Sequence, residues 1–184
     1  MIEYYGFTTE NKEEENRVEY WFKSKAELVY YVCFDATHAY LEDFDPYPHL
    51  SQFGYVLGFF PTVDVFEKSR DPMIGATIAT IVADFMSKFP KIIVLYQCET
   101  SDGLQRNRKI RFGNWYHEYG KDSGVVRKGI DIAEKKTDGT VKMHYLGYFA
   151  FCSDEDKCDI DTEFEMFAKE KVASEKAPDM AKAV

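Results

Sequence analysis

The segment Lys91-Ile-Ile-Val-Leu-Tyr-Gln-Cys98 is a nearly continuous apolar run with the length of one β-strand. A strand that is wetted on one face alternates apolar and polar side chains, whereas a strand covered on both faces is apolar throughout. The run therefore predicts the central strand of a sheet that has other structure packed on each side. The remaining elements are placed around it.

A helix is predicted before this strand. Asp71 is a favourable N-cap, and Pro72 fits the first helical position, where its missing N–H costs no hydrogen bond. Pro90 is expected to end the helix. The apolar residues of this segment recur with helical spacing and fall on one face, which indicates packing against the sheet. They are Ile74, Ile78, Ile81, Val82, Phe85 and Phe89.

A second helix is predicted after the central strand. It is expected to begin near Ser101 or Asp102, both good N-caps, and to run to about Tyr119. Gly120 then stands where a left-handed C-terminal cap is common.

Strands are predicted on both sides of this central region. Ser24-Lys-Ala separates two of them, Val18–Lys23 and Glu27–Asp35, and predicts a hairpin. Asp138-Gly139 indicates the tight turn of a second hairpin, since such turns need positive φ angles. A final amphipathic helix is expected over Ile160–Lys171. The predicted strands are residues 3–8, Val18–Lys23, Glu27–Asp35, Phe53–Phe60, Val125–Glu134 and Val141–Phe151, with solvated loops at Glu10–Asn16 and Glu42–His49.

These elements predict an α+β fold: an antiparallel or mixed sheet with two main helices on one face and an additional C-terminal helix. Residues 1–172 are expected to form a single domain, and residues 173–184, which are small or charged, a frayed tail. The chain has 184 residues, a length that suits one hydrophobic core.

Composition favours a cytoplasmic protein. The chain is 45% hydrophobic, yet it contains no 18-residue apolar run, and its first residues lack the basic and apolar regions of a secretory signal. Its cysteines form no CxxC pair and mostly adjoin apolar runs, which favours buried free thiols over zinc or disulfides. They are Cys33, Cys98, Cys152 and Cys158.

The net charge of -9 repels nucleic acid and anionic membranes on average. The segment Leu104–Lys128 is the exception, because it holds seven basic residues and only two acidic ones. An exposed basic stripe of Arg106, Lys109 and His117 on the second helix is one interpretation, and a merely solvated helix face is the other.

Arg108 and Gln105 project into the aromatic sector of the second helix, beside Trp115. A guanidinium in such a place keeps its charge and therefore needs a carboxylate, carbonyls or an anionic ligand. Both a structural ion pair and a ligand contact satisfy this requirement. The backbone at the start of the helix offers N–H groups to an anion. The candidate ligand-binding residues are Ser101, Asp102, Gly103, Gln105, Arg108, Arg111 and Trp115.

Known catalytic, nucleotide-binding and metal-binding signatures are missing from the sequence. Neither GxxxxGK[ST], GxGxxG, HExxH nor GxSxG occurs. The acidic segment Asp154–Asp161 is not a calcium loop, because Asp159 replaces the glycine needed for its sharp turn. We therefore expect neither a metal nor a cofactor.

The segment Cys98-Glu-Thr-Ser-Asp-Gly103, followed by arginines and by Phe112-Gly-Asn-Trp115, resembles an uncharacterised family of small Bacteroidetes proteins. The similarity is expected to extend from the early strands to about residue 151. The resemblance implies a bacterial cytosolic protein but no activity. The matching positions are Ser101, Asp102, Gly103, Arg108, Phe112 and Trp115.

Three functions are compatible with these observations. The favoured hypothesis is a binding or regulatory module that engages an acidic protein or a small anion through Ser101–Trp115. An enzyme of phosphoryl-transfer or nucleic-acid-processing type would use Asp102 or Glu99 as a base and Arg108 for transition-state charge. Nucleic-acid binding through the basic stripe is less favoured. The sequence does not determine the oligomeric state.

Overall fold

The structure is a computed structural model that describes residues 3–39, 41, 46–62, 71–88, 91–98, 100–101, 103–121, 123–151 and 154–174. In this part of the chain seven strands form one sheet with the order β1-β2-β3-β4-β5-β7-β6. β4 and β5 are parallel, and all other neighbours are antiparallel. The predicted α+β class is confirmed, and the sheet is mixed.

The strands are β1 Phe7–Lys12, β2 Arg17–Lys23, β3 Val29–Ala36, β4 Gly54–Pro61, β5 Ile93–Cys98, β6 Val126–Lys135 and β7 Val141–Ala150. The α-helices are α1 Pro48–Phe53, α2 Pro72–Lys88, α3 Gln105–Trp115 and α4 Asp154–Ser174. Short 3-10 turns cover Glu13–Glu15 and Thr37–Ala39, and a π-helical turn, Tyr116–Gly120, continues α3.

β5 is covered on both faces, as its apolar sequence predicted. Val94, Tyr96 and Cys98 lie in one core cluster, while Ile93 and Leu95 lie in a second cluster on the opposite face. Alternate side chains of a strand point to opposite faces, so both halves of the strand must be apolar when both are buried.

The first core cluster joins α2 and α3 to the sheet. Phe85 of α2 stacks on Phe34 of β3 with ring centroids 3.8 Å apart, and Phe112 of α3 stacks on Tyr96 of β5 at 4.3 Å. All four rings are almost completely buried. Burial of large aromatic side chains is the main stabilising contribution that such an interface makes.

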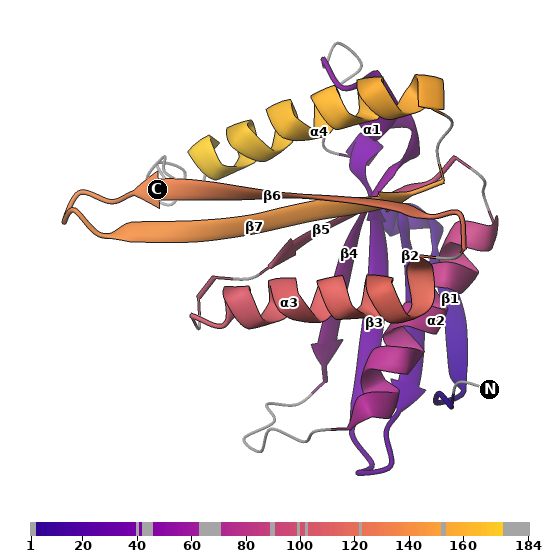
Figure 1. Ribbon diagram of the computed structural model, residues 1–184. Helices are drawn as coiled ribbons and strands as arrows, with labels where there is room; N and C mark the ends of the chain where they lie inside the picture. The colour runs from indigo at the N-terminus through magenta and orange to yellow at the C-terminus, as the bar shows by residue number, and fades with distance from the viewer. Residues whose placement is uncertain are drawn as a thin grey trace, which may run out of the picture.

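The second core cluster joins α1 and α4 to β5, β6 and β7 (Figure 1). Ile160, Phe164 and Ala168 of α4 are buried in it, so the apolar face predicted for the last helix is confirmed. Lys128 of β6 strengthens this contact through a salt bridge of 2.8 Å to Glu165.

The start of α2 follows the sequence prediction. One Asp71 carboxylate oxygen accepts a hydrogen bond from the Met73 amide, and the other accepts one from the Tyr5 hydroxyl at 2.7 Å. Asp71 therefore caps the helix and also ties the N-terminal segment to it. Phe89 and Pro90, the expected end of the helix, lie outside the described residues.

The second helix differs from its prediction at both ends. α3 begins at Gln105 with Leu104 in the N-cap position, which the sequence had assigned to Ser101 or Asp102. Gly120 does not adopt a left-handed conformation but belongs to the π-helical turn, in which the Lys121 amide donates to the Tyr116 carbonyl. The wider turn satisfies the last carbonyls without a left-handed residue.

Other boundaries shift because tertiary contacts extend elements beyond their local signals. β1 runs to Lys12 by pairing with β2, so the acidic segment predicted as a loop is partly strand. Pro48–Phe53 forms α1 within and after the predicted loop, and α4 begins at Asp154 rather than Ile160. The predicted tail lies outside the described residues except for Ala173 and Ser174, which are helical.

The two predicted hairpins are confirmed. β2 pairs with β3, and β6 pairs with β7 across a five-residue connection. Of the two residues expected to supply positive φ angles, only Gly139 does so, with φ of 83°. The Asp138 side chain instead accepts a hydrogen bond from the Thr140 amide and stabilises the turn.

Glu163 of α4 supports α1 from the side. Its buried carboxylate accepts hydrogen bonds from the amides of His49 and Leu50, at 2.9 and 3.0 Å, and contacts His49 Nδ1 at 2.6 Å. These amides belong to the first turn of α1, where no intrahelical acceptor exists. A carboxylate from a distant helix thus acts as the cap that the sequence of α1 lacks.

We predict that Glu163→Gln lowers the free energy of unfolding by about 1 to 3 kcal/mol, because neutral acceptors form weaker hydrogen bonds to the two amides. Urea denaturation measures the change. Glu170→Gln, at an exposed position of the same helix, is the matched control and should change stability little. Equal effects of the two variants would contradict the capping role.

Candidate functional site

α3 is held by aromatic packing on its inner face. Phe112 lies on Tyr96, whose ring crosses β7 at Gly147; a Cβ atom at Gly147 would lie 2.2 Å from the Tyr96 hydroxyl oxygen. That hydroxyl accepts a hydrogen bond from Arg127 Nε at 2.9 Å. Burial raises the pKa of Tyr96 to about 12, so the phenol stays neutral. These contacts hold α3 in a defined position on the sheet, so the side chains of its outer face are also defined in position.

Trp115 fixes α3 against α2. A Cβ atom at Gly75 of α2 would lie only 2.5 Å from the indole nitrogen of Trp115, so the glycine permits the indole to reach the helix backbone. Trp115 also contacts Phe112 edge-on, with ring centroids 5.4 Å apart. The indole thus has a defined position between two helices.

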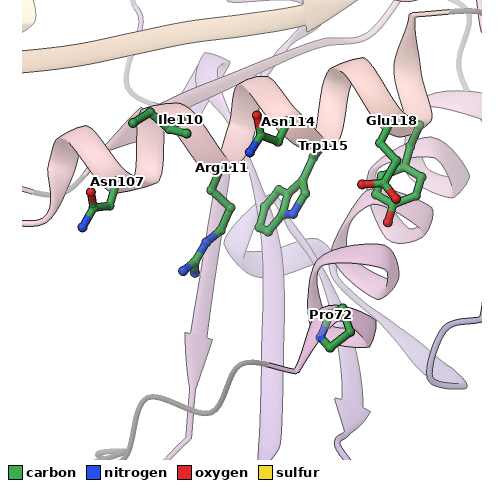
Figure 2. Close-up of a pocket in the computed structure, with 8 residues that line it drawn as sticks. Pro72, Asn107, Ile110, Arg111, Asn114, Trp115 and Glu118 are labelled. Carbon is green, nitrogen blue, oxygen red and sulfur yellow. The ribbon is translucent and has the colours of Figure 1, made fainter.

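A cleft of about 420 Å³ lies beside this contact. Figure 2 shows Arg111 and Trp115 pointing from α3 toward the side on which Pro72, the first residue of α2, lies. The described residues that line the cleft are Pro72, Asn107, Ile110, Arg111, Asn114, Trp115, Glu118 and Tyr119. Their chemistry is mixed, with one cation, one anion, two amides and two aromatic rings.

Two of the seven predicted ligand-binding residues, Arg111 and Trp115, line this cleft. The others do not. Ser101 and Gly103 are exposed beyond the start of α3, and Gly103 has a positive φ of 72°. Asp102 lies outside the described residues.

Arg108 and Gln105 are partly buried on α3 and do not line the cleft. The Gln105 side-chain carbonyl is buried and accepts no hydrogen bond within the described part of the chain. Arg108 is half-buried, and its positive charge is close enough to Cys98 of β5 to lower the pKa of that thiol. The sequence left Arg108 open between a structural ion pair and a ligand contact. Arg108 does not line the cleft, whereas Arg111, another of the candidates, does.

Cys98 is the last residue of β5. Burial raises its pKa to about 11, and the nearby positive charges of Arg108, Arg127 and Lys109 offset only part of this effect. The thiol is fully buried and protonated near neutral pH, so it is a poor nucleophile. Cys33 is buried too, but Cys158 is exposed, which corrects the expectation of buried thiols; Cys152 lies outside the described residues.

The basic stripe is partly neutralised. Lys109 forms a salt bridge of 2.5 Å with Asp131 of β6 and lies over the Tyr145 ring. Arg106 and His117 remain exposed on α3 and the π-helical turn. The enzyme hypothesis depends on Glu99 and Asp102, both outside the described residues, and stays a hypothesis.

Sequence reasoning missed most of the cleft. Arg111 shares one stripe of the helix surface with three other polar lining residues, because side chains three, four or seven residues apart lie on the same face. These are Asn107, four residues before it, and Asn114 and Glu118, three and seven residues after it. This spacing is visible in the sequence. Polar side chains on an exposed helix face are usually only solvated, so nothing marked the stripe as a site until α2 was placed beside it.

The described residues contain no group of three or more His, Cys, Asp or Glu side chains arranged to hold a metal ion. None of the described helices combines the length and apolar character needed to cross a membrane.

A family of unknown function, DUF6169, matches residues 70–141 of the chain. The match agrees with the expected resemblance to an uncharacterised family and contains the whole Cys98–Trp115 segment, but it is narrower than expected. It spans α2, β5, α3, the π-helical turn and β6, and so includes all the described residues that line the cleft. No curated protein matches the chain.

We predict that iodoacetamide at about pH 8 modifies Cys158 much faster than Cys98, because Cys158 is exposed to the reagent whereas Cys98 is buried and its raised pKa keeps the thiol protonated. Peptide mass spectrometry gives the rate for each site. Denaturant should abolish the difference. Rapid modification of Cys98 in the folded protein would contradict its burial.

We also predict that Gly75→Ala displaces the Trp115 indole and destabilises the protein by about 1 to 3 kcal/mol, because the added methyl group overlaps the indole nitrogen. Tryptophan emission in a Trp21→Phe background reports the position of Trp115 alone. Gly113→Ala in α3 is the control, since a Cβ atom there meets nothing within 4 Å. It should leave the emission unchanged and raise stability slightly through helix propensity.

Proposed function

We propose that this protein is a small binding or regulatory module whose cleft beside α3 engages a negatively charged group, on a small anion or on an acidic protein. The observation that carries the proposal is the exposed guanidinium of Arg111 in a cleft walled by Trp115. Arg111 is the one cationic side chain among the described lining residues.

The chemistry of Arg111 suits this role. A guanidinium keeps its charge at every physiological pH and presents paired N–H donors that match the two oxygens of a carboxylate or phosphate. Screening limits the reach of the acidic surface elsewhere to about 8 Å at physiological salt. The charge of the whole chain therefore does not prevent an anion from binding at this place.

The geometry of the cleft supports binding rather than bulk solvation. Trp115 is positioned by its contacts with Gly75 and Phe112, so it loses little side-chain freedom when a ligand packs against it. The volume of about 420 Å³ falls within the usual range of small-molecule sites.

We predict that acetate, N-acetylglycine or inorganic phosphate perturbs the NMR signals of residues around Arg111, and that Arg111→Gln weakens the best of these ligands about tenfold or more. Titration followed by amide chemical shifts measures both effects. Electrostatic attraction also requires that the affinity fall as salt is raised.

Arg106→Gln is the matched control. It removes the same charge from an exposed position of α3 that does not line the cleft. The control should retain binding. If the two variants weaken binding equally, the attraction is a general charge effect, and if Arg111→Gln binds as the wild type does, the proposed site is wrong.

A further inference from the structure

The far end of the cleft carries a negative charge. Glu118 lies in the π-helical turn and is exposed. Figure 2 shows it at one end of the lining stripe, with Arg111 and Trp115 further along the helix. Tyr119 follows it in the chain and also lines the cleft. Burial raises the pKa of Tyr119, and the neighbouring Glu118 carboxylate adds to this effect.

We infer that the cleft binds a short linear peptide in an extended conformation, with its carboxyl terminus at Arg111 and its amino terminus at Glu118. This inference rests on the proposed function and names the class of ligand. The cleft pairs a cation with an anion, so its charges are complementary to a zwitterion. A second carboxylate at the Glu118 end would be repelled, which disfavours dicarboxylates.

The spacing of the two charges sets the length of the ligand. Arg111 and Glu118 are seven residues apart, which places them about 10 Å apart along a helix that rises about 1.5 Å per residue. An extended peptide spans at most about 3.3 to 3.6 Å per residue. Three residues therefore bridge the distance.

Asn114 lies between the two charges on the same stripe. Its side-chain amide has an NH2 group that donates and a carbonyl oxygen that accepts hydrogen bonds. A peptide unit can pair with both, through its own carbonyl oxygen and its N–H group. A simple anion would leave this amide unused. Trp115 beside it supplies an apolar wall for the central side chain of the peptide.

The π-helical turn is an independent feature of this end of the cleft. It contains Glu118 and Tyr119, and the Lys121 amide donates to the carbonyl five residues earlier, at Tyr116, instead of four residues earlier as in a regular α-helix. Such turns interrupt the regular progression of side chains around a helix and occur frequently at functional sites. Here the turn adjoins the wall formed by Trp115.

The test uses the tripeptide glycyl-leucyl-glycine, the same peptide with an acetylated amine, and the same peptide with an amidated carboxyl group. We predict that the wild type binds the free tripeptide about tenfold more tightly than either blocked form. Calorimetry or NMR titration gives the affinities. The free dipeptide glycyl-leucine should bind more weakly, because it is too short to reach both charges.

Variants assign each terminus to its partner. Glu118→Gln should abolish the preference for the free amine and leave the affinity of the acetylated peptide unchanged. Arg111→Gln should abolish the preference for the free carboxyl group. Glu14→Gln removes an exposed carboxylate far along the chain from the cleft and should change neither preference.

The outcomes separate this inference from the function on which it rests. Equal binding of free and acetylated peptides by the wild type, an amine preference that survives Glu118→Gln, or no binding of any of the three peptides would overturn the inference. In each case the anion titration with Arg111→Gln still decides whether the cleft binds negative charge. If Arg111→Gln changes the affinity of no anion and no peptide, both proposals are wrong.

Discussion

The docking of α3 onto the sheet and onto α2 is the interaction on which the candidate site depends. Phe112 stacks on Tyr96, and the Trp115 indole occupies the space that Gly75 leaves open. Both contacts involve groups far apart in the sequence. Without them α3 would be an isolated helix with polar side chains, and too short to be stable alone in water. With them, one face of α3 becomes the wall of a cleft.

Charge pairing decides which cations remain available to a ligand. Lys109 is paired with Asp131, and Lys128 with Glu165, so two of the seven basic residues in the Leu104–Lys128 segment serve the fold. Arg127 donates to Tyr96. Arg111 differs because it lines the cleft while it is exposed. The local excess of positive charge thus includes residues that pair within the fold and one, Arg111, that lines the cleft.

The predicted ligand-binding residues overlap only partly with the residues that line the cleft. A helical projection gives the angle of each side chain, but it does not say which neighbour covers that angle. Arg108 projects close to the aromatic residues in such a plot, yet that side of α3 meets β5 and Cys98. Arg111 projects toward the rim of the same sector, where α2 approaches and leaves a cleft. The position of α2 was the missing information.

The sequence alone determined the α+β class, the two hairpins, the buried strand β5 and the start of α2 at Asp71, because these follow from local patterns: period of hydrophobicity, turn residues and helix caps. The tertiary structure decided the order of the strands, the parallel pairing of β4 with β5, and the capping of α1 by Glu163. It also decided the cleft. Each of these joins segments distant in the chain, and a local pattern carries no signal about a partner that only folding brings near.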